Sequence, residues 1–376
     1  MQKTELCIFC GARPNFIKVA PIIRVINKLA EENSPHKVTY SLVYAGLADD
    51  PTLEDGLFDN LSIRRPDAYL GVECENLNEL TGQVMSKFEQ YLQSHPTDVV
   101  IVVDDLASTM AAAIVTKKQA ITLAHIAAGT RSFDITMPKE INRLVIDGLS
   151  DILFTAGFSN NSIANKEGAE LSKVYMVGNI LIDNIRYNRE RVEGMRLNDI
   201  DALAGLPLKE GSYIVFTLNR KALLADQENL EKMLRVLCET AGDLPIIAPL
   251  RDSAVQVIMA LGLKKNISLH NLHIVKPLNY LQFAYLTSHA QGIVTDSGNV
   301  AEEATFNNIP CITLNSYTEH IETVKVGSNV LVGEDAELLR SAFTDMVSGT
   351  WKKCGIPDRW DGRSAERIVQ ILLEHR

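Results

Sequence analysis

The sequence predicts an α/β protein built from two doubly wound parallel-sheet domains, with a ligand cleft between them. Three observations lead to this fold class. The chain has 376 residues, and a single hydrophobic core rarely grows beyond roughly 250–300 residues. Short, wholly apolar runs alternate with helical patterns, which is typical of strands buried on both faces of a parallel sheet. These runs fall into two sets, which predicts one sheet in each domain.

The apolar runs predict the strands in order. The first set is Leu6–Phe9, Val38–Val43, Val99–Val103, Thr122–Ile126 and Ile152–Phe154. The second set is Tyr213–Phe216, Pro245–Ala248, Ile274–Val275, Gly292–Val294 and Cys311–Leu314. The stretch between Asn184 and Gly211 is helical, charged and loop-rich, so we place the boundary at residues 184 and 185. The last predicted helix, Ser364–His375, is amphipathic.

The composition argues against several partners. The formal net charge is −10, whereas a nucleic-acid surface needs a clustered basic face. No run of about 18 apolar residues occurs, so we expect no membrane span. The first residues lead directly into a strand-like run without the pattern of a signal peptide, and we therefore expect a cytoplasmic protein.

Cys7 and Cys10 form a C-x-x-C pair, but the context does not favour redox or metal chemistry. Such pairs usually lie on a loop or at a helix start, whereas this one lies inside an apolar run. No second pair completes a zinc site. We expect both thiols to be buried as small hydrophobic side chains.

The turn after the first strand has the composition of an anion site. Gly11 lets the backbone turn tightly, and Pro14 suits the first turn of a helix, where its missing N–H costs nothing. Arg13 and Lys18 then lie near the positive end of that helix. Ligands of open α/β sheets bind at the C-terminal ends of strands. We therefore favour an anion site over a helix start with solvated charges.

A second strand–turn–helix junction, in the other domain, has similar features. The segment Thr295–Asn299 follows the strand Gly292–Val294. Ser297 and the following N–H groups could cradle a phosphate, and Glu302 or Glu303 could accept hydrogen bonds from ribose hydroxyls. Plain capping of the helix by Ser297 is the alternative. Two such turns favour a nucleotide ligand.

Charged residues also follow two other strands of the first half. Asp104 and Asp105 end the strand Val99–Val103, where carboxylates suit metal binding, acid/base work or capping of the next helix. These alternatives remain open. His125 ends an apolar strand, a position where a histidine is more often a buried core residue. Further charged candidates are Arg131, Lys139, Glu140 and Arg143.

These features, in this order and spacing, resemble the non-hydrolysing UDP-N-acetylglucosamine 2-epimerases over nearly the whole chain. The family motifs are G-T-R-P-E-x-I-K-x-x-P, H-V-E-A-G-L-R-S, P-E-E-x-N-R, T-D-S-G-G-x-Q-E-E and T-E-R-P-E-T. The similar segments here are Gly11–Pro21, His125–Ser132, Pro138–Arg143, Thr295–Glu303 and Thr318–Thr323.

The resemblance implies two Rossmann-like halves of the glycosyltransferase-B type. It implies a domain 1–184 joined by the C-terminal segment 356–376, a nucleotide-binding domain 185–355, and a homodimer. In that family UDP leaves C1 as a proton leaves C2, and UDP re-adds after the proton returns to the other face. No metal or redox cofactor is implied. The implied UDP-sugar contacts are Arg13, Lys18, Asn219, Pro277, Tyr280, Phe283, Ser297, Gly298, Asn299 and Glu303. The residues implied in or near proton transfer are Asp105, His125, Arg131 and Arg143. Asp104, at a position that is normally glycine in the family, and Glu140 are candidates to replace lost carboxylates.

Several positions depart from the family pattern. Ala127 and Lys139 stand where the motifs have glutamates, and Asn219 stands where a strand-end motif has histidine. Removing a general acid or base usually costs about 10²–10⁴-fold in rate. We therefore expect nucleotide binding to be retained and epimerisation to be impaired or altered.

Three functions follow from the resemblance. The first is an epimerase with rewired catalysis, in which Asp104 or Glu140 supplies a missing carboxylate. The second is a non-catalytic UDP-sugar-binding regulator or partner. The loss of acid/base groups slightly favours this second function. The third, less favoured, is a glycosyltransferase on the same fold.

Overall fold

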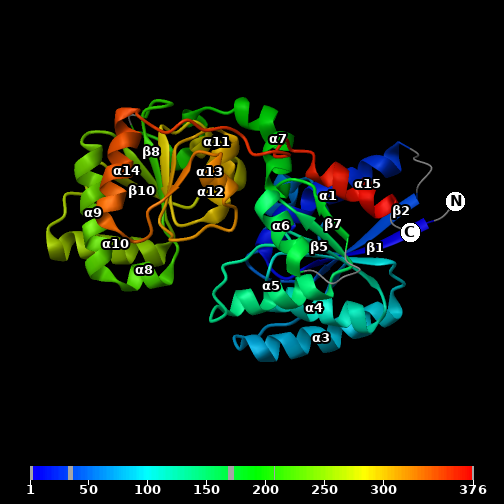
Figure 1. Ribbon diagram of the computed structural model, residues 1–376. Coiled ribbons are helices and arrows are strands. Elements are labelled where there is room, and N and C mark those ends of the chain that lie inside the picture. Colours follow the sequence, from blue (N-terminus) through cyan, green and yellow to red (C-terminus); the bar gives the residue numbers. More distant parts are fainter. Residues whose placement is uncertain (1–2, 33–36, 168–172, 207, 375–376) are drawn as a thin grey trace. The chain divides into compact units, whose positions relative to one another are not determined.

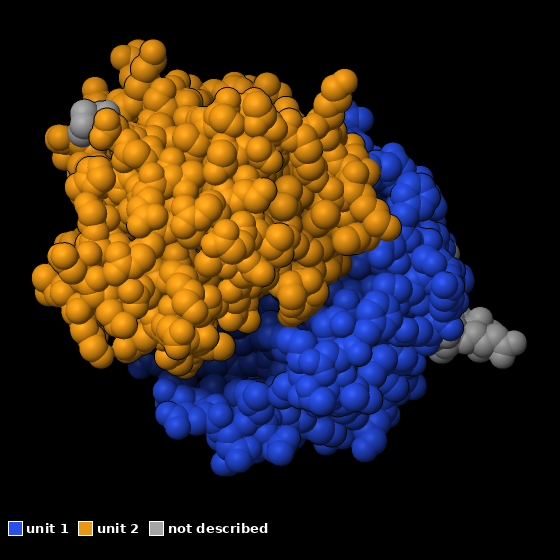
Figure 2. All heavy atoms as spheres, turned by 60° about the vertical axis from the view of Figure 1, so that its left-hand side comes forward, with its two compact units in different colours: residues 1–186, 358–376 blue, residues 187–357 orange. Residues whose placement is uncertain are grey.

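The computed structural model describes residues 3–32, 37–167, 173–206 and 208–374. The chain divides into two compact units (Figure 2). Unit 1 comprises residues 1–186 and 358–376, and unit 2 comprises residues 187–357. Each unit contains one parallel sheet with helices on both faces (Figure 1), so the predicted fold class is confirmed.

The sheet of unit 1 has the order β3-β2-β1-β4-β5-β6-β7. Its strands are β1 (Lys3–Cys10), β2 (Lys37–Tyr44), β3 (Ala68–Tyr69), β4 (Val99–Val103), β5 (Thr122–Ile126), β6 (Ile152–Thr155) and β7 (Lys173–Met176). The helices are α1 (Arg13–Glu31), α2 (Asp55–Leu61), α3 (Leu77–Ser94), α4 (Ala107–Lys118), α5 (Pro138–Leu149), α6 (Phe158–Glu167) and α15 (Ser364–Glu374), together with the first part of α7 (Ile180–Glu193).

The sheet of unit 2 has the order β10-β9-β8-β11-β12-β13, which is the order of a classic dinucleotide-binding sheet. Its strands are β8 (Ile214–Thr217), β9 (Ile246–Pro249), β10 (Leu272–Val275), β11 (Gly292–Thr295), β12 (Cys311–Thr313) and β13 (Asn329–Leu331). Its helices are α8 (Lys221–Ala225), α9 (Gln227–Ala241), α10 (Asp252–Lys265), α11 (Tyr280–Ser288), α12 (Gly298–Phe306), α13 (Glu322–Lys325) and α14 (Ala336–Ser348).

The two faces of β1 explain why the C-x-x-C pair is not a redox motif. Side chains alternate along a strand, so Cys7 packs in the core beneath α3 and α4 while Cys10 packs in the core beneath α1 and α15. Both are fully buried and carry free thiols. Burial raises the pKa of the Cys7 thiol to about 12. Both cysteines are therefore core residues, as predicted.

Membrane-spanning helices and metal sites were also considered for the residues that the structure describes. None of their helices is both long and apolar enough to cross a membrane. In the same part of the chain, no group of three or more His, Cys, Asp or Glu side chains is placed to hold a metal ion.

The last helix belongs to unit 1, where α15 lies beside α1 (Figure 1). Ile368, Val369 and Leu372 bury its apolar face in the unit 1 core. The helix start is held by Asp183, whose two carboxylate oxygens accept the backbone N–H groups of Ser364 at 3.1 Å and Ala365 at 2.8 Å. This carboxylate therefore ties the returning end of the chain to α7.

We predict that Asp183→Ala lowers the free energy of unfolding by about 1–3 kcal/mol, because two buried N–H groups lose their acceptor. Denaturant titration followed by circular dichroism measures the change. Asp183→Asn keeps one acceptor oxygen and should lose less. An unchanged unfolding midpoint in Asp183→Ala would contradict the anchoring role.

Candidate functional site

In unit 1, the candidate residues lie at the C-terminal ends of β1, β4 and β5. The sheet order changes direction between β1 and β4, which is where open α/β sheets bind ligands. Gly11 follows β1 at this point. A Cβ atom there would lie 2.1 Å from the hydroxyl oxygen of Ser108 on α4. Gly11 is thus needed for the close approach of α4 to this turn.

A carboxylate of the chain itself occupies the start of α1. Asn15 accepts the N–H groups of Gly11 at 2.9 Å and Ala12 at 3.2 Å through its Oδ1. Its amide donates to Asp104 Oδ2 at 3.1 Å, and the Lys18 ammonium donates to Asp104 Oδ1 at 2.5 Å. Asp104 thus supplies the carboxylate that meets Lys18 and Asn15 at this turn.

Asp104 is held in this position by its backbone. Its φ is +62°, a left-handed conformation that aspartate tolerates better than most residues. Its carbonyl oxygen lies 3.0 Å from Nε2 of His125, whose Nδ1 lies 2.6 Å from Asp147 Oδ1. His125 is therefore a buried residue that positions Asp104.

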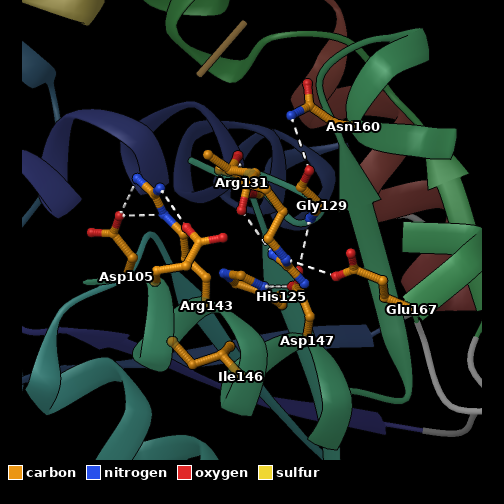
Figure 3. A network of polar contacts seen from close by, with 12 residues as sticks. Asp105, His125, Gly129, Arg131, Arg143, Ile146, Asp147, Asn160 and Glu167 are labelled. Atoms are coloured by element: carbon orange, nitrogen blue, oxygen red, sulfur yellow. Dashed lines mark hydrogen bonds and ion pairs between the residues drawn. The ribbon is translucent and has the colours of Figure 1, made fainter. Parts of the chain in front are cut away.

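A buried network continues from Asp147 (Figure 3). Its Oδ2 accepts the N–H of Gly129 at 3.0 Å and Nη1 of Arg131 at 2.8 Å. Nε of Arg131 lies 2.8 Å from Glu167 Oε2. Burial raises the pKa of Asp147, but the bonds from His125 and Arg131 lower it more, so the net shift is downward. Arg131 and His125 thus hold the loop after β5 in place from within the core.

Asp105 lies next to two cationic side chains, those of Arg143 and Lys139. Its Oδ2 accepts Nη2 of Arg143 at 2.7 Å, and Nζ of Lys139 lies 3.5 Å from its Oδ1. The Asp105 side chain is 13% exposed and the Lys139 side chain 58%. Ala127, half-buried after β5, has φ +67° and no ionisable group.

Glu140 has a different environment. Its oxygens accept Ser132 N at 2.9 Å, Ser132 Oγ at 2.9 Å, Phe133 N at 3.1 Å and Arg143 Nη1 at 3.2 Å. Burial raises the pKa of Glu140, but these bonds outweigh it and the net shift is downward. A carboxylate held this way secures the turn at residues 132–133, and its role in proton transfer stays a prediction.

In unit 2, the corresponding change of direction lies between β8 and β11. Asp296 joins the two strand ends, because its Oδ2 accepts the N–H groups of Asn219 and Arg220, each at 2.6 Å. Its Oδ1 is buried and has no hydrogen-bond partner among the described residues. The hydroxyls of Thr217 and Thr295 share a hydrogen bond of 2.6 Å behind it.

The start of α12 is open in a way that the start of α1 is not. Ser297 occupies the N-cap position without a side-chain capping bond. Gly298 and Asn299 in the first turn are exposed, and a helix begins with N–H groups that have no partner within the helix. The positive end of α12 is therefore available to an anion.

Glu303 lies one turn further along α12 and is half-buried. Burial, together with the neighbouring Glu302, raises its pKa from the usual 4.5 to about 7. Glu302 in turn lies 3.6 Å from Nε2 of His320. Near neutral pH, Glu303 can thus change its charge.

The remaining predicted contacts of unit 2 lie after β10, at the edge of the sheet. Pro277 is exposed, while Tyr280 and Phe283 are half-buried on the first turn of α11. The N-cap Asn279 accepts Gln282 N at 3.0 Å. These residues share the C-terminal edge of the sheet with Ser297 but follow a different strand.

Sequence reasoning missed the residues that organise both edges. Asp147 and Asp296 each accept two or more donors from other segments. Asn15 accepts the N–H groups of its own turn and donates to Asp104. Asn15 and Asp296 stood inside the recognised motifs, so their positions were visible although their roles were not. Asp147 lies on α5, four residues beyond Arg143, and spacing alone does not separate it from a solvated helix residue.

Comparison with known proteins identifies the family of this chain. The family model described as UDP-N-acetylglucosamine 2-epimerase matches residues 30–373. The UDP-N-acetylglucosamine 2-epimerase of Methanocaldococcus jannaschii is 32% identical over 98% of each chain. A UDP-2,3-diacetamido-2,3-dideoxy-D-glucuronate 2-epimerase of Pseudomonas aeruginosa is 31% identical over 98% of this chain and 99% of its own.

Solved structures of similar proteins also share the fold of this chain. That of the M. jannaschii UDP-GlcNAc 2-epimerase in complex with UDP-GlcNAc and UDP superposes with a TM-score of 0.81 at 31% identity, covering 99% of this chain and 100% of the other. A lipopolysaccharide outer core galactosyltransferase, at 12% identity and a TM-score of 0.56, covers 99% of this chain and 97% of its own and shares the fold alone. This likeness agrees with the glycosyltransferase-B-like fold. The chain therefore belongs to the UDP-N-acetylglucosamine 2-epimerase family.

Proposed function

We propose that this protein binds a UDP-N-acetylhexosamine and epimerises it at C2 at a reduced rate. The observation that carries the binding part is the open start of α12, where Ser297 leaves the first-turn N–H groups of Gly298 and Asn299 without a side-chain cap. We assign the diphosphate to this turn and the ribose to Glu303. Asn219, Pro277, Tyr280 and Phe283 complete the proposed nucleotide contacts of unit 2.

Unit 1 supplies the proposed chemistry. In the family reaction the C2 proton leaves as the C1–O bond to UDP breaks, and the proton then returns to the opposite face as UDP re-adds. Asp105 is the candidate base, since its carboxylate is partly exposed beside Arg143 and Lys139. Ala127 has no ionisable group, so one proton transfer lacks the glutamate of the family motif. That loss supports a rate reduced by about 10²–10⁴-fold.

Deuterium exchange tests the reaction directly. The protein is incubated with UDP-N-acetylglucosamine in deuterium oxide, and the hydrogen at C2 is followed by proton NMR. Slow incorporation above that of the Asp105→Asn variant supports the proposal. Exchange no faster than in buffer, with no free UDP formed, would contradict epimerisation of this substrate.

A non-catalytic UDP-sugar-binding role is the second candidate. It is favoured because both alternative carboxylates are engaged, Asp104 by Lys18 and Asn15, and Glu140 by Ser132, Phe133 and Arg143. Calorimetry with UDP separates the two candidates. Binding without C2 exchange supports the second, and no binding at millimolar UDP contradicts both.

Glu303 makes the proposed binding depend on pH. Only the ionised carboxylate accepts hydrogen bonds from both ribose hydroxyls, and its pKa is raised to about 7. Affinity for UDP-N-acetylglucosamine should therefore rise about tenfold between roughly pH 6 and 8. Isothermal calorimetry across this range measures it, with Glu303→Gln as the flat control. A constant affinity in the unmodified chain would contradict the ribose contact.

The raised pKa of Glu303 also determines how the stability of the fold changes with pH. The folded chain keeps a proton on Glu303 that the unfolded chain releases above its usual pKa of 4.5. The contribution to stability is therefore complete below about pH 4.5 and is lost as pH rises through about 7. Bound ribose, which favours the charged form, should offset this loss.

We also propose a homodimer. Phe133, Ile135, Ile141 and Leu144, on the loop before α5 and on α5 itself, are 73%, 68%, 41% and 40% exposed, which supports a surface that another molecule covers. Light scattering coupled to size-exclusion chromatography should give twice the chain mass of 41.6 kDa. A mass equal to that of one chain would contradict the dimer.

A further inference from the structure

Helix α12 carries two adjacent carboxylates in different surroundings. Glu303 is half-buried, whereas Glu302 is 4% exposed. His320, 6% exposed in the segment between β12 and α13, places its Nε2 3.6 Å from Glu302 Oε1. We propose that His320 is a positioning residue for nucleotide binding, which offsets the charge of Glu302 beside the contacts assigned to α12. This role rests on the proposed function, in which α12 binds the diphosphate and the ribose.

The carboxylate of Glu302 lies close to the turn assigned to the diphosphate. A Cβ atom at Gly298 would lie 4.0 Å from Glu302 Oε1, and this is the oxygen that faces His320. A buried negative charge at such a distance repels a phosphate, and it costs free energy when it has no counter-charge. A positive imidazole beside it reduces both effects, so the start of α12 remains attractive to an anion.

His320 is held against Glu302 by its own turn. Its carbonyl oxygen accepts the backbone N–H of Thr323 at 3.0 Å and the hydroxyl of Thr323 at 2.8 Å. That hydroxyl in turn accepts Nδ2 of Asn329 at 3.2 Å, and both Thr323 and Asn329 are fully buried. The imidazole therefore projects from a backbone that is fixed in the core, unlike that of a solvated surface histidine.

The elements packed against α12 are β11, β12, β13 and α13. Strands β11 and β13 carry no titratable side chain, and the Cys311 thiol of β12 stays neutral because burial raises its pKa to about 12. Helix α13 and the loops beside it add Asp296, Glu319, His320, Glu322, Lys325 and Lys352. Lys325 is exposed and Lys352 is half-buried, so His320 is the buried base of this set.

Glu303 reports the charge of the pair formed by His320 and Glu302. Burial raises the pKa of Glu303 and the negative charge of Glu302 raises it further, to about 7. A positive charge on His320 offsets that of Glu302, and it therefore favours the ionised form of Glu303. The motif T-E-R-P-E-T has arginine at the position of His320. Arginine keeps its charge, whereas a histidine can lose its charge near neutral pH, so the counter-charge in this chain depends on pH.

Calorimetry of the full-length chain with UDP near neutral pH tests the counter-charge. His320→Gln, which keeps a polar side chain but cannot become positive, should weaken UDP binding about tenfold. His320→Arg keeps a positive charge and should bind at least as tightly as the unmodified chain. In the Glu302→Gln background, His320→Gln should have little further effect, since the charge that it balances is gone. His270→Gln is the matched control, because His270 is exposed before β10.

A second measurement does not depend on UDP. In the ligand-free chain, NMR follows the carboxyl carbon of Glu303 with pH, its signal being identified by its absence in Glu303→Gln. The midpoint should fall by about one pH unit in Glu302→Gln and rise by about half a unit in His320→Gln.

Unchanged UDP binding with an unshifted midpoint in His320→Gln would overturn the role of His320 alone. An unshifted midpoint in Glu302→Gln would overturn the coupling even if His320→Gln does not fold. The role is equally overturned if His320→Gln loses as much UDP affinity in the Glu302→Gln background as in the unmodified chain. Absence of UDP binding in every chain, the unmodified one included, would instead contradict the proposed function.

Discussion

The double variant Ala127→Glu, Lys139→Glu is expected to exchange the C2 hydrogen of UDP-N-acetylglucosamine at least about a hundredfold faster than the unmodified chain. Both positions carry glutamate in the family motifs that this sequence resembles. The change places one carboxylate at position 139, where the side chain of Lys139 lies 3.5 Å from Asp105, and a second in the loop after β5. The proposed reaction needs such groups to remove and return a proton. Deuterium incorporation at C2, followed by proton NMR, gives the rate.

The local structure accommodates both substitutions. Ala127 is half-buried in the loop just beyond β5, at a backbone φ of +67° that it already adopts. The Lys139 side chain is 58% exposed. It lies in the first turn of α5, where a carboxylate interacts favourably with the positive helix end. Arg143 still pairs with Asp105 at 2.7 Å, so the base keeps its nearest cation.

Ala127→Gln, Lys139→Gln is the matched control, since it adds side chains of the same size without a proton-transfer group. It should exchange no faster than the unmodified chain. If the glutamate variant folds with the same unfolding midpoint and binds UDP but shows no gain, the reduced rate has another cause. The non-catalytic candidate would then be favoured.

The second large effect is expected at Asp104, where Asp104→Asn and Asp104→Gly should each bind UDP about tenfold more tightly. In the unmodified chain the Asp104 carboxylate accepts from Lys18 at 2.5 Å and from Asn15 at 3.1 Å. Lys18 is one of the predicted UDP-sugar contacts, so we expect this carboxylate to compete with the ligand for the Lys18 ammonium. Asparagine keeps the shape and the left-handed φ of +62° while removing the charge, and glycine also relieves the backbone. Calorimetry with UDP measures the gain.

A double-mutant cycle with Lys18→Met tests the cause. If the competition acts through Lys18, the gain from Asp104→Asn should largely disappear in the Lys18→Met background. Unchanged or weaker UDP binding in both Asp104 variants would contradict the competition. Loss of C2 deuterium exchange in Asp104→Asn would instead show that Asp104 supplies a proton-transfer group.

Much of the fold could be predicted from local pattern alone. Each apolar run in the list of predicted strands lies on a strand of the structure, and the sets separate into two sheets. The strands that were missed are β3, β7 and β13, which have two, four and three residues. Each of them is an edge strand of its sheet, and none is fully buried along its length.

The candidate site could be predicted only in part, and the physical reason is distance along the chain. The motifs located Gly11, Asp104 and Ser297 at strand ends, because a parallel sheet brings those ends to one edge. They did not show which donor each carboxylate meets. The bonds from Lys18 and Asn15 to Asp104 join residues 86 and 89 positions apart, so no helix or strand period reveals them.

The sequence by itself thus determined the fold class, the positions of the strand-end motifs and the family. Local periodicity and turn chemistry are sufficient for these. Only the tertiary structure decided which charged groups are held by hydrogen bonds and ion pairs and which helix start is left without a cap. It showed that Asp104 holds the start of α1, that Glu140 secures the 132–133 turn, and that the start of α12 is left open. Those outcomes depend on side chains from distant segments meeting at a sheet edge, where burial and hydrogen bonding determine which groups remain available to a ligand.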